Sequence, residues 1–507
     1  MSKATSHREI EFKFRIPEGT ELSTAQDLRH LLDALDLDVR APEARSMVAT
    51  YFDTPNLSLL RWGITLRNRR GGGDDGWHLK VPAAPSGTAP ARDEIRIDKD
   101  TADIPHELIA MVSPLLRRQE LHPMATVRTL RQPFVITSHD GTPLIEAVDD
   151  RVDVESQVTG GSGSSFHEIE VELLVDSDTA QETAARISHA LIEASARPSS
   201  LSKAAQALGS AAGDPPDVPD LPLPDPTAPS IDALQAIFAS YLRDLLMADV
   251  GVRRDLPDSV HQMRVACRRL RSALKTFRPL LDSEAVEYLR VELQWLASEL
   301  GEVRDTEVQR ARLCGLSDDE ETTTFIANTL DSRLRAATSS ALAALRTDRH
   351  DFLLEDLVLL VREPPVTAGA FDSAGQRLPE CVAVPWRRLA KSVRKASVNG
   401  PAHQWHEVRI RAKQARYSAE AVAPVLGSHF ATLGKSLGKA TDILGSRQDA
   451  HVSSLVLEEL VAHAPGPIAY QLGLIAARNE VAGNEDIRVF HKRWADIVHQ
   501  AKEAGLD

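Results

Sequence analysis

Two patterns of apolar and polar positions divide the chain. Up to about residue 200, short stretches alternate apolar with polar residues or are rich in β-branched and aromatic residues, which is typical of strands. These stretches lie at 9–16, 48–52, 64–69, 78–81, 94–97, 126–130, 134–137, 144–148 and 167–174. Helical spacing is found near 24–36, 105–118 and 179–195. This half of the chain is therefore predicted to be β-dominated.

From residue 231 onward, apolar residues follow helical spacing almost throughout, as at 231–247, 259–281, 285–300 and 402–422. That spacing predicts an all-α half. The segment between the two halves, 211–230, contains seven prolines. Proline interrupts helices and central strands and favours extended polyproline II, so this segment predicts a linker. The expected organisation is one domain at 5–210, a proline-rich linker at 211–230 and a second domain at 231–507.

The helical half contains a diverged internal duplication. The first copy reads VHQMRVACRRLRSAL at 260–274, and the second reads WHEVRIRAKQARYSA at 405–419. A downstream pair follows at nearly the same offset, LGEVRDTEV at 300–308 and LGSRQDAHV at 444–452. A unit of this length is too long for a solenoid repeat, so the duplication predicts two helical bundles related by a pseudo-two-fold axis.

Length and composition limit the remaining classes. A chain of 507 residues is expected to form two or more domains, each with a sizeable core. Its three cysteines are far apart and lack zinc-ligand spacing, which argues against a disulfide framework or structural zinc. No apolar run approaches the roughly 20 residues that span a bilayer. The strand-like stretch at 9–15 leaves no room for a signal peptide. We expect a soluble, cytoplasmic protein.

The first candidate chemistry lies on the polar faces of the predicted strands. Glu9, Glu11 and Lys13 alternate with apolar residues, and Glu168, Glu170 and Glu172 do the same. A solvated face of an antiparallel sheet would explain any one strand. If the strands close into a barrel, however, these charges point inward and need counter-ions. Carboxylates bind Mg²⁺ or Mn²⁺, and Arg and Lys bind phosphate oxygens, so a metal bound to a polyphosphate would satisfy both groups.

An ordered series of motifs gives this half a family resemblance. ExExK stands at Glu9, Glu11 and Lys13, and YFDT at 51–54 precedes Gly63 and an LRxR stretch at 66–69. WHLK at 77–80, the AVDD segment ending at Asp150 and a late Ser-Lys pair at 202–203 follow. Residues 5–208 thus resemble the CYTH, or triphosphate tunnel metalloenzyme, family. A glycine-rich P-loop is absent, since GGGDDG at 71–76 lacks the following Lys-Ser/Thr and is predicted to be a hairpin loop.

The resemblance implies an eight-stranded antiparallel β tunnel with flanking helices that hydrolyses a triphosphate with Mg²⁺ or Mn²⁺. The implied metal ligands are Glu9, Glu11, Asp150, Glu170 and Glu172. The implied catalytic residues are Glu9, Glu11 and Lys13. The implied substrate-binding residues are Lys13, Arg45, Arg67, Arg69, Lys80, Arg92, Arg128 and Lys203.

The helical half carries a basic stripe in each copy of the duplication. His261, Arg264, Arg268 and Arg271 recur at helical spacing, and His406, Arg409, Lys413 and Arg416 repeat it. A basic helical face is usually only solvated, but its duplication with the histidines in register favours an anionic ligand. Residues 230–505 resemble the CHAD family of conserved-histidine α-helical domains, which implies inorganic polyphosphate binding. The implied binding residues are His261, Arg264, Arg268, Arg271, Lys275, Arg278, Arg388, Lys391, His406, Arg409, Lys413, Arg416, Lys435 and Lys439.

These expectations combine into an α+β, two-domain inorganic triphosphatase whose partners are tripolyphosphate and long-chain polyphosphate, with association with polyphosphate granules. Two alternatives stay open: a non-catalytic polyphosphate-binding scaffold, and an enzyme acting on an organic triphosphate such as thiamine triphosphate or a nucleotide, including an adenylate cyclase. Nucleic acid is a disfavoured partner. Aromatic residues make up only 5% of the chain, and its formal net charge of −14 opposes non-specific duplex binding.

Overall fold

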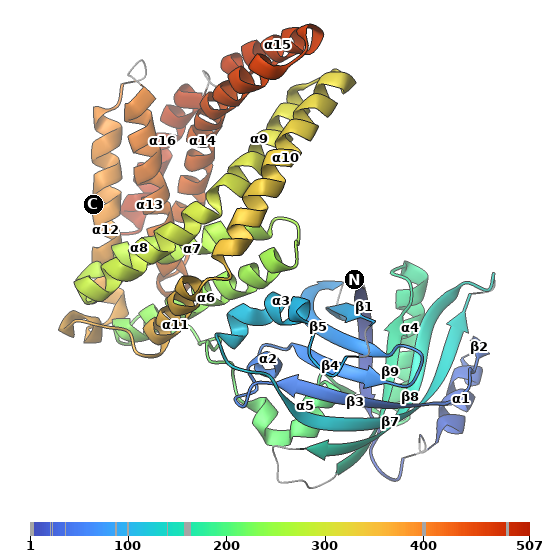
Figure 1. The fold of residues 1–507 in the computed structure, drawn as a ribbon. Helices are drawn as coiled ribbons and strands as arrows, with labels where there is room; N and C mark the ends of the chain where they lie inside the picture. The colour runs from blue at the N-terminus through green and yellow to red at the C-terminus, as the bar shows by residue number, and fades with distance from the viewer. Residues whose placement is uncertain are drawn as a thin grey trace. The chain divides into compact units, whose positions relative to one another are not determined.

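A computed structural model describes residues 5–20, 22, 24–35, 37–86, 89–98, 101–138, 140–156, 164–397, 402–482 and 486–506. The chain divides into two compact units, here called the barrel domain (residues 1–217) and the helical domain (residues 218–507). The division falls inside the proline-rich segment. Figure 1 shows the β-strands in the first unit and a helical second unit.

The barrel domain is built on eight antiparallel strands that close on themselves. In spatial order they run β1-β6-β5-β4-β3-β7-β8-β9, and β9 pairs with β1. Their bounds are β1 Thr5–Arg15, β3 Arg45–Asp53, β4 Thr65–Arg70, β5 Gly76–Ser86, β6 Ala89–Ile97, β7 His122–Thr137, β8 Pro143–Ser156 and β9 Ser164–Leu173. Two short strands complete the sheet: β2 (Asp38–Arg40) pairs with β7, and β10 (Arg197–Ser199) pairs with β1. The predicted closed antiparallel barrel is confirmed.

Closure is achieved because β1 changes partner along its length. Its first part pairs with β6, where Glu9 faces Arg92. Its second part pairs with β9, where Glu11 faces Glu172. Since successive side chains alternate between the two faces of a strand, the charged residues at odd positions of β1 all project to the inside of the barrel.

Helices cover the apolar outside of the barrel. Helices α1 (Ala25–Ala34) and α4 (Asp178–Glu193) bury Leu28, Leu32 and Ile187 in one core cluster with outward residues of β1, β8 and β9. Thr24 begins α1 with a capping box, in which its side chain and that of Asp27 satisfy each other's backbone N–H groups. The remaining helices are α2 (Ser58–Arg61), α3 (His106–Leu116) and α5 (Lys203–Leu208).

Part of the barrel interior is apolar rather than charged. Ala204, Ala207 and Leu208 of α5 belong to one buried cluster with Val152 and Val154 of β8. These two valines share the inward face of β8 with Asp150, because the three residues are separated by even numbers of positions. Helix α5 thus covers the apolar stretch of the interior and brings Lys203, its first residue, next to the charged stretch.

The proline-rich segment is held by the domains on either side of it. Asp214 lies 2.8 Å from Arg61, and Asp217 pairs with Arg117, both in the barrel domain. In the helical domain Val218 is fully buried, and its carbonyl oxygen accepts a hydrogen bond of 2.8 Å from Arg243. The predicted linker therefore includes residues that pack onto one domain or the other, and residues 209–213 form a 3-10 helix.

The helical domain consists of α6 (Ser230–Arg253), α7 (Ser259–Thr276), α8 (Ser283–Glu299), α9 (Gly301–Leu316), α10 (Glu320–Ala344), α11 (Asp348–Arg362), α12 (Ala374–Lys395), α13 (Ala402–Leu426), α14 (Ser428–His463), α15 (Gly466–Ala482) and α16 (Asp486–Glu503). The two basic motifs lie on α7 and α13. Of the two LGxxxD segments, the first lies at the start of α9 and the second in the middle of α14. Helix α9 runs beside α10, and α14 beside α13 and α15 (Figure 1). The all-α architecture is confirmed. Among the described residues, every helix is too short or too polar to cross a bilayer.

Candidate functional site

A charged cavity of about 240 Å³ lies inside the barrel. Its lining comes from the inward positions of the strands, from the β4–β5 loop and from the start of α5. The lining residues are His7, Glu9, Glu11, Lys13, Met47, Ala49, Tyr51, Thr65, Arg67, Arg69, Asp74, Lys80, Arg92, Glu94, Val127, Thr129, Arg131, Glu146, Glu170, Glu172, Ser202 and Lys203. Acidic and basic side chains thus share one small space, as the alternating strands predict.

The carboxylates of β1 are paired with lysines inside the cavity. Lys80 donates a hydrogen bond to Glu9, and Lys13 lies 3.1 Å from Glu11 while donating to Glu170. Burial raises the pKa of Glu9 despite the nearby Lys80. Glu11 and Glu170 each have a pKa below the usual value, because the lysines outweigh their burial. These pairs keep charged groups in place in a site that excludes much of the solvent.

Glu172 differs from the other carboxylates. It faces Glu11 across the β1–β9 pairing and Glu146 across the β8–β9 pairing. Burial, followed by the charges of Glu9, Glu11 and Glu170, raises the pKa of Glu172 to about 8, although Lys80 opposes the shift. A carboxyl group in this position gains a proton or a cation, since either one relieves the repulsion between neighbouring carboxylates.

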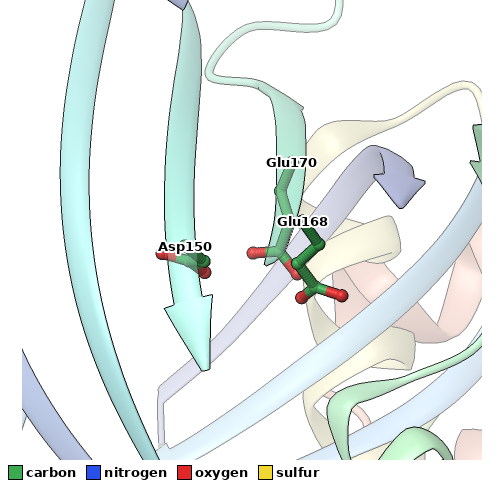
Figure 2. Close-up of side chains that lie close together, drawn as sticks. All are labelled: Asp150, Glu168 and Glu170. Atoms are coloured by element: carbon green, nitrogen blue, oxygen red, sulfur yellow. The ribbon is translucent and has the colours of Figure 1, made fainter. Parts of the chain in front are cut away.

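A second acidic group lies deeper in the barrel. Asp150, Glu168 and Glu170 can each place one oxygen within 4.8 Å of the others (Figure 2). The ammonium group of Lys203 lies 2.9 Å from Asp150 and 2.8 Å from Glu170, and it also pairs with Glu168. Three buried carboxylates could bind a divalent metal, but here a lysine supplies the positive charge.

The basic residues gather around Glu94 and Tyr51. Arg67 lies 3.3 Å from Glu94 and 3.4 Å from the hydroxyl of Tyr51, and these groups raise its pKa although burial opposes the shift. Arg69 has a pKa lowered to about 9, because burial and the charges of Arg67 and Arg131 outweigh the nearby acids. Arg69 therefore lies where an additional anion would be stabilising.

The structure brings most of the expected substrate-binding residues to the cavity, with two exceptions. Lys13, Arg67, Arg69, Lys80, Arg92 and Lys203 line it. Arg128 does not, since 59% of its side chain is exposed and its guanidinium lies 3.7 Å from Glu155. Arg45 is exposed at the start of β3, where it donates a hydrogen bond of 3.0 Å to the carbonyl oxygen of Gly72.

The position of Arg128 follows from strand geometry. Val127, Thr129 and Arg131 line the cavity, so Arg128 projects from the opposite face of β7. Sequence reasoning missed Arg131, which lies on the inward face and donates hydrogen bonds to Asp150 and Glu170. Sequence reasoning also assigned no role to Glu94 or Glu146, and it placed Glu168 on the charged strand face with Glu170 without naming it as a ligand. The alternation of β7 from Val127 to Arg131 was a usable signal for Arg131.

Of the five expected metal ligands, Glu9, Glu11, Glu170 and Glu172 line the cavity, whereas Asp150 is fully buried behind it. The donor chemistry fits a hard divalent cation, because carboxylate oxygens are what Mg²⁺ and Mn²⁺ prefer. Glu172, which faces Glu11 across the β1–β9 pairing, has the raised pKa of a carboxylate among like charges and is a further candidate ligand. Glu170 pairs with three cations, Lys13, Lys203 and Arg131, whereas Glu9 pairs with Lys80 and Glu11 with Lys13.

In the helical domain, the duplicated motifs form matching contacts. Arg264 on α7 lies 2.9 Å from Asp305 on α9, and Arg409 on α13 lies 4.0 Å from Asp449 on α14. A hydrogen bond of 3.4 Å from Arg268 to the hydroxyl of Tyr417 joins the two basic helices. The two aspartates thus orient equivalent arginines, as the duplication predicts.

Lys413 lies at the centre of this basic surface. Its pKa is lowered to about 8, first by burial and then by the charges of Arg409 and Arg268, with Asp449 opposing and Arg264 adding to the effect. Burial and neighbouring arginines also lower the pKa of His261. Cations that lower one another's pKa form a surface that an anion would stabilise.

The other expected polyphosphate-binding residues are distributed around this centre. Arg264, Arg268 and Arg271 line a cavity of about 660 Å³ together with residues of α8, α9, α10 and α14. Burial lowers the pKa of Lys275, and the charges of arginines on α8, α13 and α12, together with Arg271, lower it further. Arg416 donates hydrogen bonds to Glu420 and Thr441. The remaining members are exposed on helix surfaces or beside them: Arg278, Arg388, Lys391, His406, Lys435 and Lys439.

Comparison with known proteins agrees with this architecture. The family model of the CYTH domain matches residues 7–207, and that of the CHAD domain matches residues 236–458. The chain therefore belongs to the family of proteins in which a CYTH domain precedes a CHAD domain. CYTH domains are triphosphate tunnel metalloenzymes with triphosphatase or cyclase activity, which supports a phosphoryl-transfer enzyme that uses a metal.

Particular relatives cover nearly the whole chain. Uncharacterized proteins Rv2226 and MT2285, from the H37Rv and CDC 1551 strains of Mycobacterium tuberculosis, are each 30% identical to this chain over 502 residues. The match covers 92% of this chain and 92% of each relative. Among solved structures, the CHAD domain from the plant Ricinus communis is 26% identical with a TM-score of 0.46, covering 53% of this chain and 94% of the plant domain.

Proposed function

We propose that the barrel domain hydrolyses the terminal phosphoanhydride bond of inorganic tripolyphosphate with Mg²⁺ or Mn²⁺, and that the helical domain binds inorganic polyphosphate. One observation carries the first part: a closed barrel holds four inward glutamates and six inward Lys or Arg side chains of the expected set around one cavity. Carboxylates and cations in one buried space suit a ligand that combines a metal with a polyanion.

The cavity residues would have two roles, metal binding and phosphate binding. Glu9, Glu11 and Glu172 would hold the divalent ion, which supplies positive charge to phosphate oxygens and orients water. Lys13, Arg67, Arg69, Lys80 and Arg92, which all line the cavity, would hold phosphate oxygens through charge-assisted hydrogen bonds. Phosphoryl transfer demands positioning and charge stabilisation more than covalent chemistry by the protein, and a rigid barrel that presents fixed cations meets that demand.

The test is phosphate release from tripolyphosphate, ATP, thiamine triphosphate and long-chain polyphosphate, each with Mg²⁺, Mn²⁺ or EDTA. We expect release from tripolyphosphate to be fastest and to be lost in EDTA. Glu9→Gln and Glu11→Gln should each lower turnover by at least ~100-fold, since they remove ligands of the ion. Glu155→Gln is the matched control, because its side chain is 69% exposed and lies outside the cavity.

Three outcomes would contradict this assignment. Faster release from ATP or thiamine triphosphate would favour the alternative of an organic triphosphate as substrate. Release from no compound, with retained polyphosphate binding, would favour the non-catalytic scaffold. Undiminished turnover in both glutamine variants would show that the cavity carboxylates do not bind a required ion.

The second part is supported by the basic surface centred on Lys413. Its cations come from both copies of the duplication, and two of the arginines are oriented by aspartates. A gel shift with long-chain polyphosphate tests binding directly. The double variant Arg264→Gln/Arg409→Gln should weaken binding by at least ~10-fold, because two charge-assisted contacts are lost. Arg478→Gln on α15 is the control, since Arg478 is exposed and pairs with Asp318. Localisation to polyphosphate granules would follow from such binding.

A further inference from the structure

The loop between β4 and β5 places a carboxylate inside the cavity. Asp74 belongs to this loop and pairs with Arg69, which is 8% exposed. The neighbouring Asp75 is exposed and does not line the cavity. Of the two consecutive aspartates, only Asp74 is therefore directed to a cation that the proposed function assigns to substrate.

The backbone of this loop is anchored in three places. Arg45 donates a hydrogen bond to the carbonyl oxygen of Gly72, and Nε2 of His78 lies 2.9 Å from the carbonyl oxygen of Asp74. Gly71 has a φ of +82°, and a Cβ there would lie 2.4 Å from the carbonyl oxygen of Ser46. The loop backbone therefore fits closely against β3, so a change in the Asp74–Arg69 pair would come from the Asp74 side chain rather than from the backbone.

The electrostatics of Arg69 explain why an acid is needed there. Arg69 is buried beside Arg67 and Arg131, which both disfavour its charge. One carboxylate oxygen of Asp74 pairs with Arg69, while its other oxygen is buried and has no hydrogen-bond partner among the described residues. A carboxylate held in this way resembles a phosphate group in charge and in its acceptor oxygens, yet it leaves part of its hydrogen-bonding capacity unused.

We propose that Asp74 is an internal competitor for the phosphate-binding position at Arg69, and that a phosphate group of the substrate displaces its side chain. This inference rests on the proposed function, because it takes the cavity to bind a triphosphate. Asp74 then determines affinity: it satisfies Arg69 in the free protein, and every binding event must break the Asp74–Arg69 pair. The apparent affinity is reduced by the fraction of molecules in which the pair is formed.

The experiment measures binding separately from turnover. The probe is imidotriphosphate, a triphosphate with nitrogen bridges that resists hydrolysis, titrated calorimetrically with Mg²⁺ into the full-length protein. Asp74→Asn should tighten binding by about three- to tenfold, since it removes a competing ion pair. Asp75→Asn, which removes the same charge from the next residue, should leave affinity within about twofold, as expected of an exposed charge.

A double-mutant cycle identifies the residue through which Asp74 acts. In an Arg69→Gln background, Asp74→Asn should change affinity by no more than about twofold, because the pair no longer exists. The inference is overturned if Asp74→Asn binds imidotriphosphate no more tightly than the wild type does. It is also overturned if Asp75→Asn raises the affinity as much as Asp74→Asn does. Tightening that persists in the Arg69→Gln background overturns it as well. Wild-type protein that binds no imidotriphosphate would instead overturn the proposed function, so the two failures are distinguishable.

Discussion

Arg131 on β7 and Asp150 on β8 form two parallel hydrogen bonds, of 2.8 Å from Nε and 2.6 Å from Nη2. Asp150 is fully buried, and Arg131 also donates to Glu170 at 2.8 Å. A planar guanidinium matches a carboxylate in this bidentate arrangement, which fixes the direction of the side chain as well as its charge. The pair sets Arg131 inside the barrel, at the edge of the cavity.

This relationship predicts different effects for two nearby arginines of β7. Arg131→Gln should destabilise the barrel domain by about 3–5 kcal/mol, because it leaves buried carboxylates without a partner. Arg128→Gln should change stability by no more than about 0.5 kcal/mol, since its side chain is largely exposed. Hydrogen exchange of β7 and β8 peptides in the full-length protein measures both effects. Equal protection in the two variants would contradict the assignment of Arg131 to the interior.

Lys203 offers a second test of the buried charge network. It contacts Asp150, Glu168 and Glu170 at once, and the three carboxylates raise its pKa well above the usual value despite its burial. Lys203→Met should lower the free energy of opening of β8 and β9 by about 3–5 kcal/mol, since a buried charge is left uncompensated. Lys203→Arg keeps the charge and should recover part of the loss. If β8 and β9 of Lys203→Met exchange hydrogen as slowly as those of the wild type, this lysine does not balance the charge of the acidic cluster.

The same variant separates a structural role from a metal site. If the three carboxylates bind a divalent ion once Lys203 is removed, Mg²⁺ or Mn²⁺ should raise the hydrogen-exchange protection of β8 and β9 more in Lys203→Met than in the wild type, whose proposed ion lies at Glu9, Glu11 and Glu172. Stabilisation by a ligand grows with its concentration relative to the dissociation constant, so a titration gives the affinity. Equal stabilisation of the wild type would mean that metal and lysine occupy different positions.

Asp53 of the YFDT motif is predicted to be structural. It is buried, and its carboxylate accepts hydrogen bonds from the backbone N–H groups of Thr54, Leu59 and Leu60 at 2.7 to 2.9 Å. Asp53→Asn replaces one acceptor oxygen by a donor that faces a backbone N–H group, at a cost of about 1–3 kcal/mol. Faster hydrogen exchange in 51–61, with kcat for tripolyphosphate within about twofold of wild type, is the expected result. A large loss of kcat with unchanged exchange would assign Asp53 to the reaction instead.

Much of this architecture could be predicted because strand alternation is a local property. The period of two in Glu9, Glu11 and Lys13 predicted one charged face, and barrel closure directed that face inward. The same rule would have placed Arg128 outside the cavity, because Val127 and Thr129, its neighbours in the sequence, both point inward. Its assignment rested on motif position alone and not on which face of β7 it occupies.

Other features depend on contacts that no local pattern contains. Arg45 is separated from the inward Met47 by two positions, yet it lies at the exposed start of β3, where its guanidinium donates a hydrogen bond to a loop carbonyl oxygen. Nothing in GGGDDG distinguishes Asp74 from Asp75, because the difference arises from how the loop lies against β3. Likewise, only the barrel places Lys203 beside carboxylates more than thirty residues earlier in the chain.

The final prediction concerns pH and the helical domain. Lys413 has a pKa lowered to about 8 in the free protein, and the charged groups that face it are Arg409 of its own helix, Arg264 and Arg268 of α7, and Asp449 of α14. Only the protonated lysine attracts a polyanion, so binding raises its pKa. Affinity for long-chain polyphosphate should therefore be highest below about pH 8 and fall as the pH rises through that value, by up to about tenfold per pH unit.

Lys413→Arg should remove this pH dependence, because the guanidinium stays charged well above pH 10 or so. Lys391→Arg on α12 is the matched control, since Lys391 is exposed and should leave the wild-type profile unchanged. Binding titrations at fixed ionic strength, from about pH 7 to about pH 10, measure how the affinity changes with pH. Arginine keeps its charge over this range. Because burial and neighbouring cations lower the pKa of Lys413 in the free protein, its affinity for a polyanion must fall as the pH rises. A wild-type affinity that is constant across this range, or a slope that persists in Lys413→Arg, would show that Lys413 does not face the bound anion.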